Sequence, residues 1–248
     1  MDSLMLSSRH SERDRMMYEW LVQTFQASPL PLFDKLEAFP RFITKRSLAR
    51  LLCKHEIFQK IVPVNGYIIE CGVLNGAGLF AWGHFTNIYE PSNYNRKIIG
   101  FDTFAGFPHI APADQNVDKN PEVGDLHGDS LDHLLASVER YNLERHLAHL
   151  PNIELVAGDF CETGPAWLAK NKHALVSLLY LDFDLYEPTK LALELFLPRM
   201  GKGAIICFDE LMCANYPGET VALLETLCLE KYQIQRFPIE PWISYIQL

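Results

Sequence analysis

Two patterns of apolar residues alternate along this chain. Short continuous apolar runs predict strands, and apolar positions three or four residues apart predict helices. The runs lie at 67–69, 97–102, 153–156, 175–181, 204–208, 232–237 and 243–247. The helical spacing occupies 12–25, 44–61, 79–85, 130–141, 164–170, 188–197 and 218–229. Helices that alternate with strands predict an α/β fold built on a mostly parallel, Rossmann-like sheet.

The last two apolar runs differ from the rest because no helix separates them. Only a short segment with Pro238 and Pro241 lies between 232–237 and 243–247. Strands this close in sequence can pair only in the antiparallel direction. We therefore expect an antiparallel pair at the C-terminal edge of the sheet.

The first two helices precede every strand. They predict an N-terminal helical cap at 1–62, in front of a domain at 63–248, with residues 1 to about 12 frayed. Thr44 and Ser47 offer a polar cap for the second helix. In the first helix, the apolar side chains are expected to form one buried face: Met16, Met17, Trp20, Leu21 and Phe25.

A glycine-rich turn follows the first strand, in the run Glu70-Cys71-Gly72-Val73-Leu74-Asn75-Gly76-Ala77-Gly78. Glycines allow positive φ and close backbone approach, and the start of the next helix offers free N–H groups. The next strand ends on Asp102, where an acid commonly accepts hydrogen bonds from ribose hydroxyls. The sequence therefore predicts a nucleotide-like ligand here. It lacks GxGxxG and GxxxxGK[ST], which argues against dinucleotide and P-loop sites.

Carboxylates stand at the ends of five predicted strands. In an open α/β sheet the ligand crevice lies at the carboxyl ends of the strands, so these acids should converge on one rim. Such a rim suits hydroxyl-rich or cationic ligands and divalent metals. The acids are Glu70, Asp102, Asp159, Asp182 with Asp184, and Asp209 with Glu210.

The segment at about 108–130 is too long for an ordinary connection between a strand and a helix. Long loops inside compact domains are often lids or binding loops, so we predict a lid insertion. Its acids lack the spacing of a calcium loop and are expected to form a solvated face. They are Asp114, Asp118, Glu122, Asp125 and Asp129.

The composition of the chain indicates its size class and argues against some kinds of binding partner. With 248 residues, 48% of them hydrophobic, the chain suits one globular domain with a small appendage. Its net charge of −9 argues against nucleic-acid binding, and no apolar stretch is long enough to span a membrane. The six cysteines show no CxxC pairing, which favours reduced thiols in a cytoplasmic protein.

Four separated runs carry a family resemblance: Glu70–Val73, Gly100–Pro108, Leu181–Thr189 and Phe208–Glu210. With Gly158-Asp159, their order resembles class I S-adenosylmethionine (SAM)-dependent methyltransferases. Within that class they look like the macrocin O-methyltransferase (TylF-like) family of sugar O-methyltransferases, and the similarity runs from about residue 40 to about residue 220.

The resemblance implies a SAM site in three parts. The methionine end and sulfonium would be held by the turn residues Glu70, Gly72, Asn75 and Gly76. Asp102, with Thr103 beside it, would accept the ribose hydroxyls. Asp159 and Phe160 would bracket the adenine.

The resemblance also implies a divalent cation, usually magnesium, on Asp182, Asp209 and Glu210. Such an ion would lower the pKa of a coordinated acceptor hydroxyl. Asp182 is the first candidate for the base that removes the hydroxyl proton, followed by Asp184 and His109. One departure weakens the metal assignment, because Asp-Glu followed by leucine replaces the Asp-Asp followed by tyrosine found in much of the family.

The leading hypothesis is therefore a SAM-dependent, metal-assisted O-methyltransferase that acts on a hydroxyl of a sugar or a related hydroxylated natural-product metabolite. Two alternatives remain open at this stage: a metal-independent enzyme that methylates an amine or carboxylate, and a SAM-binding protein without activity. The resemblance further suggests a homodimer or larger homo-oligomer. The sequence does not identify the acceptor.

Overall fold

The computed structural model describes residues 11–116 and 121–248. The chain divides into two compact units, one ending at Arg50 and one running from Leu51 to Leu248. This division falls inside helix α3 (Lys45–Ile61), earlier than the expected boundary after residue 62. Of the start expected to be frayed, residues 1–10 lie outside the described part of the chain, and Ser11 caps the first helix.

The smaller unit is helical. It contains α1 (Glu12–Ala27), α2 (Leu32–Glu37), the short helix η1 (Phe39–Arg41) and the start of α3. The prediction of a buried face on α1 was wrong: no residue of α1 is buried, and Trp20 is 68% exposed. An apolar stripe on a helix shows where a partner could bind, but it does not show that the chain supplies one.

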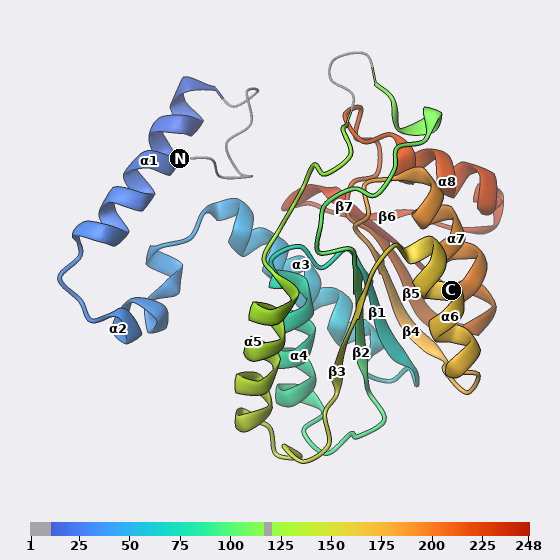
Figure 1. The fold of residues 1–248 in the computed structure, drawn as a ribbon, viewed down its shortest axis with the longest axis horizontal. Coiled ribbons are helices and arrows are strands. Elements are labelled where there is room, and N and C mark those ends of the chain that lie inside the picture. The colour runs from blue at the N-terminus through green and yellow to red at the C-terminus, as the bar shows by residue number, and fades with distance from the viewer. Residues whose placement is uncertain (1–10, 117–120) are drawn as a thin grey trace. The chain divides into compact units, whose positions relative to one another are not determined.

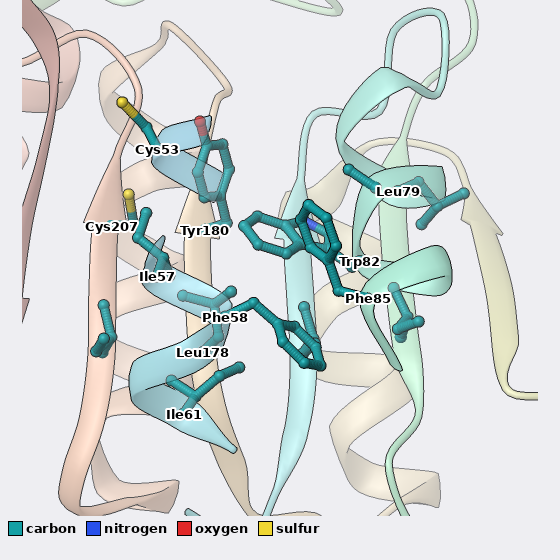
Figure 2. Packing of buried hydrophobic residues seen from close by; sticks show 14 of the residues in the cluster. Cys53, Ile57, Phe58, Ile61, Leu79, Trp82, Phe85, Leu178, Tyr180 and Cys207 are labelled. Atoms are coloured by element: carbon teal, nitrogen blue, oxygen red, sulfur yellow. The ribbon is translucent and has the colours of Figure 1, made fainter. Parts of the chain in front are cut away.

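Helix α3 begins as the sequence predicts. The Thr44 hydroxyl accepts the Ser47 N–H at 3.0 Å, which satisfies one of the free donors of the first turn. Beyond the division, α3 buries its apolar face completely in the larger unit, through Cys53, Ile57, Phe58 and Ile61 (Figure 2). This second half of α3 is therefore part of the core of the sheet domain.

Seven strands form one sheet in the order β3-β2-β1-β4-β5-β7-β6 (Figure 1). The first five in this order are parallel, and β7 pairs antiparallel with both β5 and β6. The predicted fold class, including the antiparallel C-terminal strands, is confirmed. The strands are β1 (Tyr67–Cys71), β2 (Ile98–Asp102), β3 (Ile153–Ala157), β4 (Val176–Leu181), β5 (Met200–Phe208), β6 (Gln235–Phe237) and β7 (Glu240–Gln247).

Helices cover both faces of the sheet (Figure 1). One core packs α3, α4 (Ala77–Tyr89) and α5 (Leu131–Glu144) against it, with Trp82 and Tyr180 among its fully buried side chains. The second core uses α6 (Phe160–Lys170), α7 (Tyr186–Phe196) and α8 (Gly218–Thr226). Three short helices complete the fold: η2 (Pro112–Asp114), η3 (Leu197–Arg199) and η4 (Leu229–Lys231).

The long segment between β2 and α5 is folded back on itself. The Phe107 N–H donates to the Asp125 carbonyl at 3.0 Å, and the Gly124 N–H donates to the Phe107 carbonyl at 2.9 Å. The Cβ that Gly106 lacks would lie 2.4 Å from the Gly124 oxygen, so this close approach requires glycine. These contacts fasten the two ends of the predicted lid to each other.

The expectation that the lid acids form a solvated face was wrong for Asp114, which is 2% exposed. One of its oxygens accepts the Tyr186 N–H at 2.6 Å, and the other accepts the Ala111 N–H at 2.9 Å. Burial raises the pKa of Asp114, while these two bonds lower it. Asp114 therefore connects the lid to the start of α7. Asp118 lies outside the described residues.

No helix in the described part of the chain is both long and apolar enough to cross a membrane. All six cysteines are free thiols.

Candidate active site

A crevice opens at the carboxyl ends of β1 to β4, where the sequence placed it. It is walled by the turns after these strands and by the lid segment around Phe107 and Leu126. Most of the residues singled out from the sequence line it: Gly72, Asp102, Thr103, Asp159, Phe160, Asp182 and Asp184.

Gly72 brings the ends of β1 and β4 together. A Cβ at this position would lie 2.0 Å from the Asp182 carbonyl oxygen, and the φ of Gly72 is +95°. Beside it, the Asp182 N–H donates to the Cys71 carbonyl at 2.8 Å. The glycine is therefore required by the crossing of two backbones at the base of the crevice.

Asp102 joins the turn after β1 to the turn after β2. One carboxylate oxygen accepts the N–H groups of Val73 (2.7 Å) and Leu74 (2.8 Å), and the other accepts the Phe104 N–H at 2.7 Å. A carboxylate offers about four acceptor positions, so three bonds leave it able to accept a ribose hydroxyl. Asp102 thus holds the two turns in place and also lines the crevice.

Thr103 shapes the start of the lid. Its hydroxyl donates to the Gly106 carbonyl at 2.6 Å and accepts the Ala105 N–H at 3.1 Å. Both bonds are local, so the side chain stabilises a tight turn on the wall of the crevice.

Asp159 and Phe160 form the wall after β3. Asp159 caps α6, because its carboxylate accepts the Cys161 N–H at 2.8 Å. The Phe160 ring is 3% exposed and packs against Phe101 and Phe183, with ring centres 5.1 and 4.9 Å away. A polar acceptor beside an apolar wall fits the edge and face of a purine ring.

His109, predicted as a candidate base, lies between two carboxylates. Its Nδ1 is 3.4 Å from Asp159, and its Nε2 is 2.7 Å from Glu187 on α7. With Asp159 and Cys161 it forms the one group of three metal-ligating side chains gathered within 4.8 Å among the described residues. Burial raises the pKa of Cys161 to about 11, so its sulfur remains a thiol near neutral pH. His109 therefore links the lid to the predicted adenine end.

Glu70 does not line the crevice. It is 2% exposed and lies beneath the first turn of α4, where a Cβ on Gly78 would be 2.0 Å from its carboxylate. Burial raises the pKa of Glu70 to about 8, against the lowering effect of Lys54. The group is therefore mostly protonated at neutral pH. Asn75 is exposed, and Gly76 starts α4 with a φ of +78°.

Asp209, at the end of β5, is 2% exposed and turned toward the core. It accepts a hydrogen bond from the Tyr180 hydroxyl, which in turn accepts one from the Lys54 ammonium at 2.7 Å. The Lys54 nitrogen is 3.9 Å from the same Asp209 oxygen. The sequence analysis missed Lys54 and Tyr180. The pattern predicts only a helix around Lys54 and a buried strand around Tyr180, and neither prediction marks a functional residue.

A further buried carboxylate adjoins this end of the sheet. Glu219, at the start of α8, is 0% exposed, and one of its oxygens accepts the Glu210 N–H at 3.1 Å. Burial, followed by the charges of Asp184 and Asp209, raises the pKa of Glu219 well above its usual range. An acid in the first turn of a helix is ordinarily solvated, so no sequence signal marks this one.

The predicted metal ligands come from neighbouring strand ends, since the Asp209 N–H donates to the Leu181 carbonyl at 2.9 Å. In the described part of the chain, Asp182, Asp209 and Glu210 do not form a group with oxygens within 4.8 Å of one another. Carboxylate oxygens are the ligands that a hard divalent cation prefers, so the types of residue at this end of the sheet are suitable for one. The metal assignment stays a prediction.

Asp184 lies beside the crevice in a left-handed conformation, with a φ of +62° and 7% exposure. Asp114 accepts the Tyr186 N–H at the start of the neighbouring helix α7. A non-glycine residue held at positive φ is uncommon and is found preferentially at functional sites.

In a comparison with known protein families, residues 41–222 match the family described as macrocin O-methyltransferase (TylF). A crystal structure of CalS11, calicheamicin methyltransferase, is 30% identical over 100% of this chain and 97% of its own, with a TM-score of 0.91. The apo structure of CalS11, named there as a TDP-rhamnose 3′-O-methyltransferase of calicheamicin biosynthesis, is 30% identical over 100% and 99%, with a TM-score of 0.83. The O-methyltransferase NovP, 20% identical over 80% and 79% with a TM-score of 0.59, shares the fold. No curated protein sequence matches.

Proposed function

The chain belongs to the macrocin O-methyltransferase (TylF) family, and we propose that it methylates a sugar hydroxyl during the biosynthesis of a natural product. It is a SAM-dependent O-methyltransferase. The sugar acceptor is supported by CalS11, which is similar to this chain over its whole length and is named as acting on TDP-rhamnose.

One observation carries the proposal: a single crevice contains the turn after β1, the acid that ends β2 and the acid–aromatic pair after β3. We propose that Gly72 lies against the methionine end of SAM, Asp102 accepts from the ribose, and Asp159 with Phe160 contacts the adenine. Asp182 and Asp184 line the same crevice. The acceptor hydroxyl would therefore lie next to two carboxylates.

The reaction needs an in-line approach of the acceptor oxygen to the methyl carbon. SAM supplies an electrophilic methyl group: the new oxygen–carbon bond forms as the sulfur–carbon bond breaks, leaving S-adenosylhomocysteine. We assign Asp182 as first candidate for the carboxylate that accepts the hydroxyl proton, with Asp184 next. The lid, fastened through Phe107, would keep bulk water from the reacting atoms.

We further propose a divalent cation, such as magnesium, on Asp182, Asp209 and Glu210. The position of these acids on adjacent strand ends supports it. Bound there, the ion would lower the pKa of the acceptor hydroxyl. The specific alternative is a metal-independent reaction, favoured by the Lys54 ammonium that already neutralises part of the charge around Asp209.

The test uses SAM labelled with ¹³C in the methyl group and TDP-rhamnose as acceptor, with the product read by NMR. We expect an O-methyl signal that is lost in Asp182→Asn and after chelation of divalent metal. Turnover that survives chelation would refute the metal assignment alone. Methyl transfer to an amine or carboxylate, with none to any sugar, would refute the sugar proposal.

We also propose that the enzyme acts as a homo-oligomer in a reducing compartment such as the cytoplasm. The exposed apolar side chains of Trp20 and Phe33 support the first part, and the six free thiols support the second. Sedimentation of the purified protein as a monomer at micromolar concentration would refute the oligomer.

A further inference from the structure

Three side chains with different ligand atoms meet beside the adenine end of the proposed SAM site. His109 comes from the start of the lid, and Asp159 and Cys161 lie at the start of α6. One histidine nitrogen, one carboxylate oxygen and the cysteine sulfur all lie within 4.8 Å of one another. The proposed methyl transfer gives the sulfur no role.

The start of α6 holds two of these three groups in place. Asp159 caps the helix, because its Oδ1 accepts the Cys161 N–H at 2.8 Å, and its Oδ2 faces His109 Nδ1 at 3.4 Å. The Cys161 thiol is hydrogen-bonded to the same carboxylate. All three side chains are partly exposed, so an ion from the solvent can reach them.

His109 is oriented in the way that metal-binding histidines commonly are. Its Nε2 lies 2.7 Å from a carboxylate oxygen of Glu187 on α7, while its Nδ1 faces Asp159. A ligating histidine usually directs its other ring N–H to a carboxylate, which fixes the tautomer and the ring. With the proton on Nε2, the lone pair of Nδ1 is available to an ion.

The spacing and the types of these groups fit zinc. Zinc binds thiolate sulfur at about 2.3 Å, and imidazole nitrogen or carboxylate oxygen at about 2.0–2.2 Å, in tetrahedral geometry. Ligand atoms at these bond lengths are about 3.3–3.6 Å apart. The 3.4 Å between His109 Nδ1 and Asp159 Oδ2 already has this value. Magnesium prefers oxygen ligands, so a site with an imidazole and a sulfur favours zinc over it.

We propose that His109, Asp159 and Cys161 form a zinc site, with the fourth position of the ion open to water, and that a bound ion competes with SAM. Binding is a ligand exchange without oxidation. The S–H bond of Cys161 breaks, its proton goes to the solvent, and the thiolate donates the remaining electron pair to zinc. Glu187 is a positioning residue, because it acts through His109.

The competition rests on the proposed function, in which Asp159 accepts a hydrogen bond from the adenine. Asp159 Oδ1 already accepts the Cys161 N–H, and a zinc ion on Oδ2 would occupy the other oxygen. The ion would also tie the lid to α6 through His109. Zinc should therefore lower the apparent affinity for the cofactor.

The first measurement detects the site in the full chain, with Co²⁺ in place of zinc. Co²⁺ bound to a thiolate gives a charge-transfer absorption band in the near ultraviolet, and added Zn²⁺ should remove it. We expect the band in the wild type and its loss in Cys161→Ser. Cys228→Ser is the matched control, because Cys228 is an exposed thiol outside the group. Glu187→Gln should keep the band but weaken Co²⁺ binding about 10–100-fold.

The second measurement follows S-adenosylhomocysteine binding by calorimetry, with and without Zn²⁺. Magnesium is kept in excess, so that the proposed oxygen-ligand site is filled throughout. With zinc at about ten times its dissociation constant, competition predicts about 10-fold weaker binding to the wild type. Cys161→Ser should bind S-adenosylhomocysteine equally well with and without zinc.

A wild type without the band, or a Cys161→Ser variant that keeps it, would overturn the zinc site. A normal band together with an S-adenosylhomocysteine affinity that zinc does not change would overturn the competition. If the wild type binds no S-adenosylhomocysteine even without zinc, the proposed cofactor site fails instead, and the band alone decides the zinc site.

Discussion

The Cβ that Gly72 lacks would lie 2.0 Å from the carbonyl oxygen of Asp182. Gly72→Ala must therefore separate β1 from β4 and also adopt a strained φ. We expect a loss of more than about 3 kcal/mol of unfolding free energy, with loss of S-adenosylhomocysteine binding, measured by chemical denaturation and calorimetry. Gly201→Ala is the control, because nothing lies within 4 Å of its added Cβ. Equal stability of the two variants would contradict this geometry.

Replacing one carboxylate oxygen of Asp102 by an amide nitrogen should weaken cofactor binding more than it lowers the stability of the fold. Asp102→Asn can keep the bonds from Val73 and Leu74, but its amide nitrogen cannot accept the Phe104 N–H or a ribose hydroxyl. We expect S-adenosylhomocysteine to bind about 10-fold more weakly or worse, as judged by calorimetry. Asp129→Asn, which alters an acid at the start of α5, should bind normally; a matching loss there would mean a non-specific charge effect.

The pKa of Glu70, raised from 4.5 to about 8, makes stability depend on pH. Between these values the folded protein holds a proton that the unfolded chain releases. The stabilisation is therefore complete below about pH 4.5 and is lost as the pH rises to about 8. Glu70→Gln removes this term, so its melting temperature should fall less than that of the wild type between about pH 5 and pH 8. Parallel melting curves would show that Glu70 does not titrate in this range.

Asp114 should control the lid. Asp114→Ala removes the acceptor of the buried Ala111 N–H and of the part-buried Tyr186 N–H, at a cost of about 1–3 kcal/mol. Because Tyr186 begins the helix beside the crevice, we expect the KM for the acceptor to rise as well. Glu122→Gln, a change at an exposed lid acid, is the control. An Asp114 variant with normal melting temperature and KM would place the lid's anchor elsewhere.

Local sequence rules predicted the framework well, because strands and helices here follow apolar periodicity. They placed Gly72, Asp102 and Asp182 on one crevice, since the ends of parallel strands meet in space. The same rules failed for Trp20 and Asp114. Whether another element covers a helix face or a loop acid depends on tertiary contacts, which periodicity does not encode.

Lys54, Tyr180 and Glu219 show a second limit. Each lies in an element that the pattern identifies correctly, but the polar atoms of Lys54 and Tyr180 contact each other and Asp209 across long stretches of sequence, and Glu219 is buried at the start of its helix. A lysine on a helix and a tyrosine in a strand have no local signature of burial. Only the packed structure shows that they surround an acid at a strand end.

The kinetics of a His109 variant should distinguish two roles: removal of the acceptor proton, and binding of SAM at its adenine end. If it removes the acceptor proton, His109→Ala should lower kcat by about 10²–10⁴-fold. Its contacts with Asp159 and Glu187 instead place it at the predicted adenine end, so we expect a higher KM for SAM with kcat largely kept. Glu187→Gln should shift the KM in the same direction, and His133→Ala, at an exposed histidine, should change neither constant. A fall in kcat at saturating SAM would restore His109 as the base.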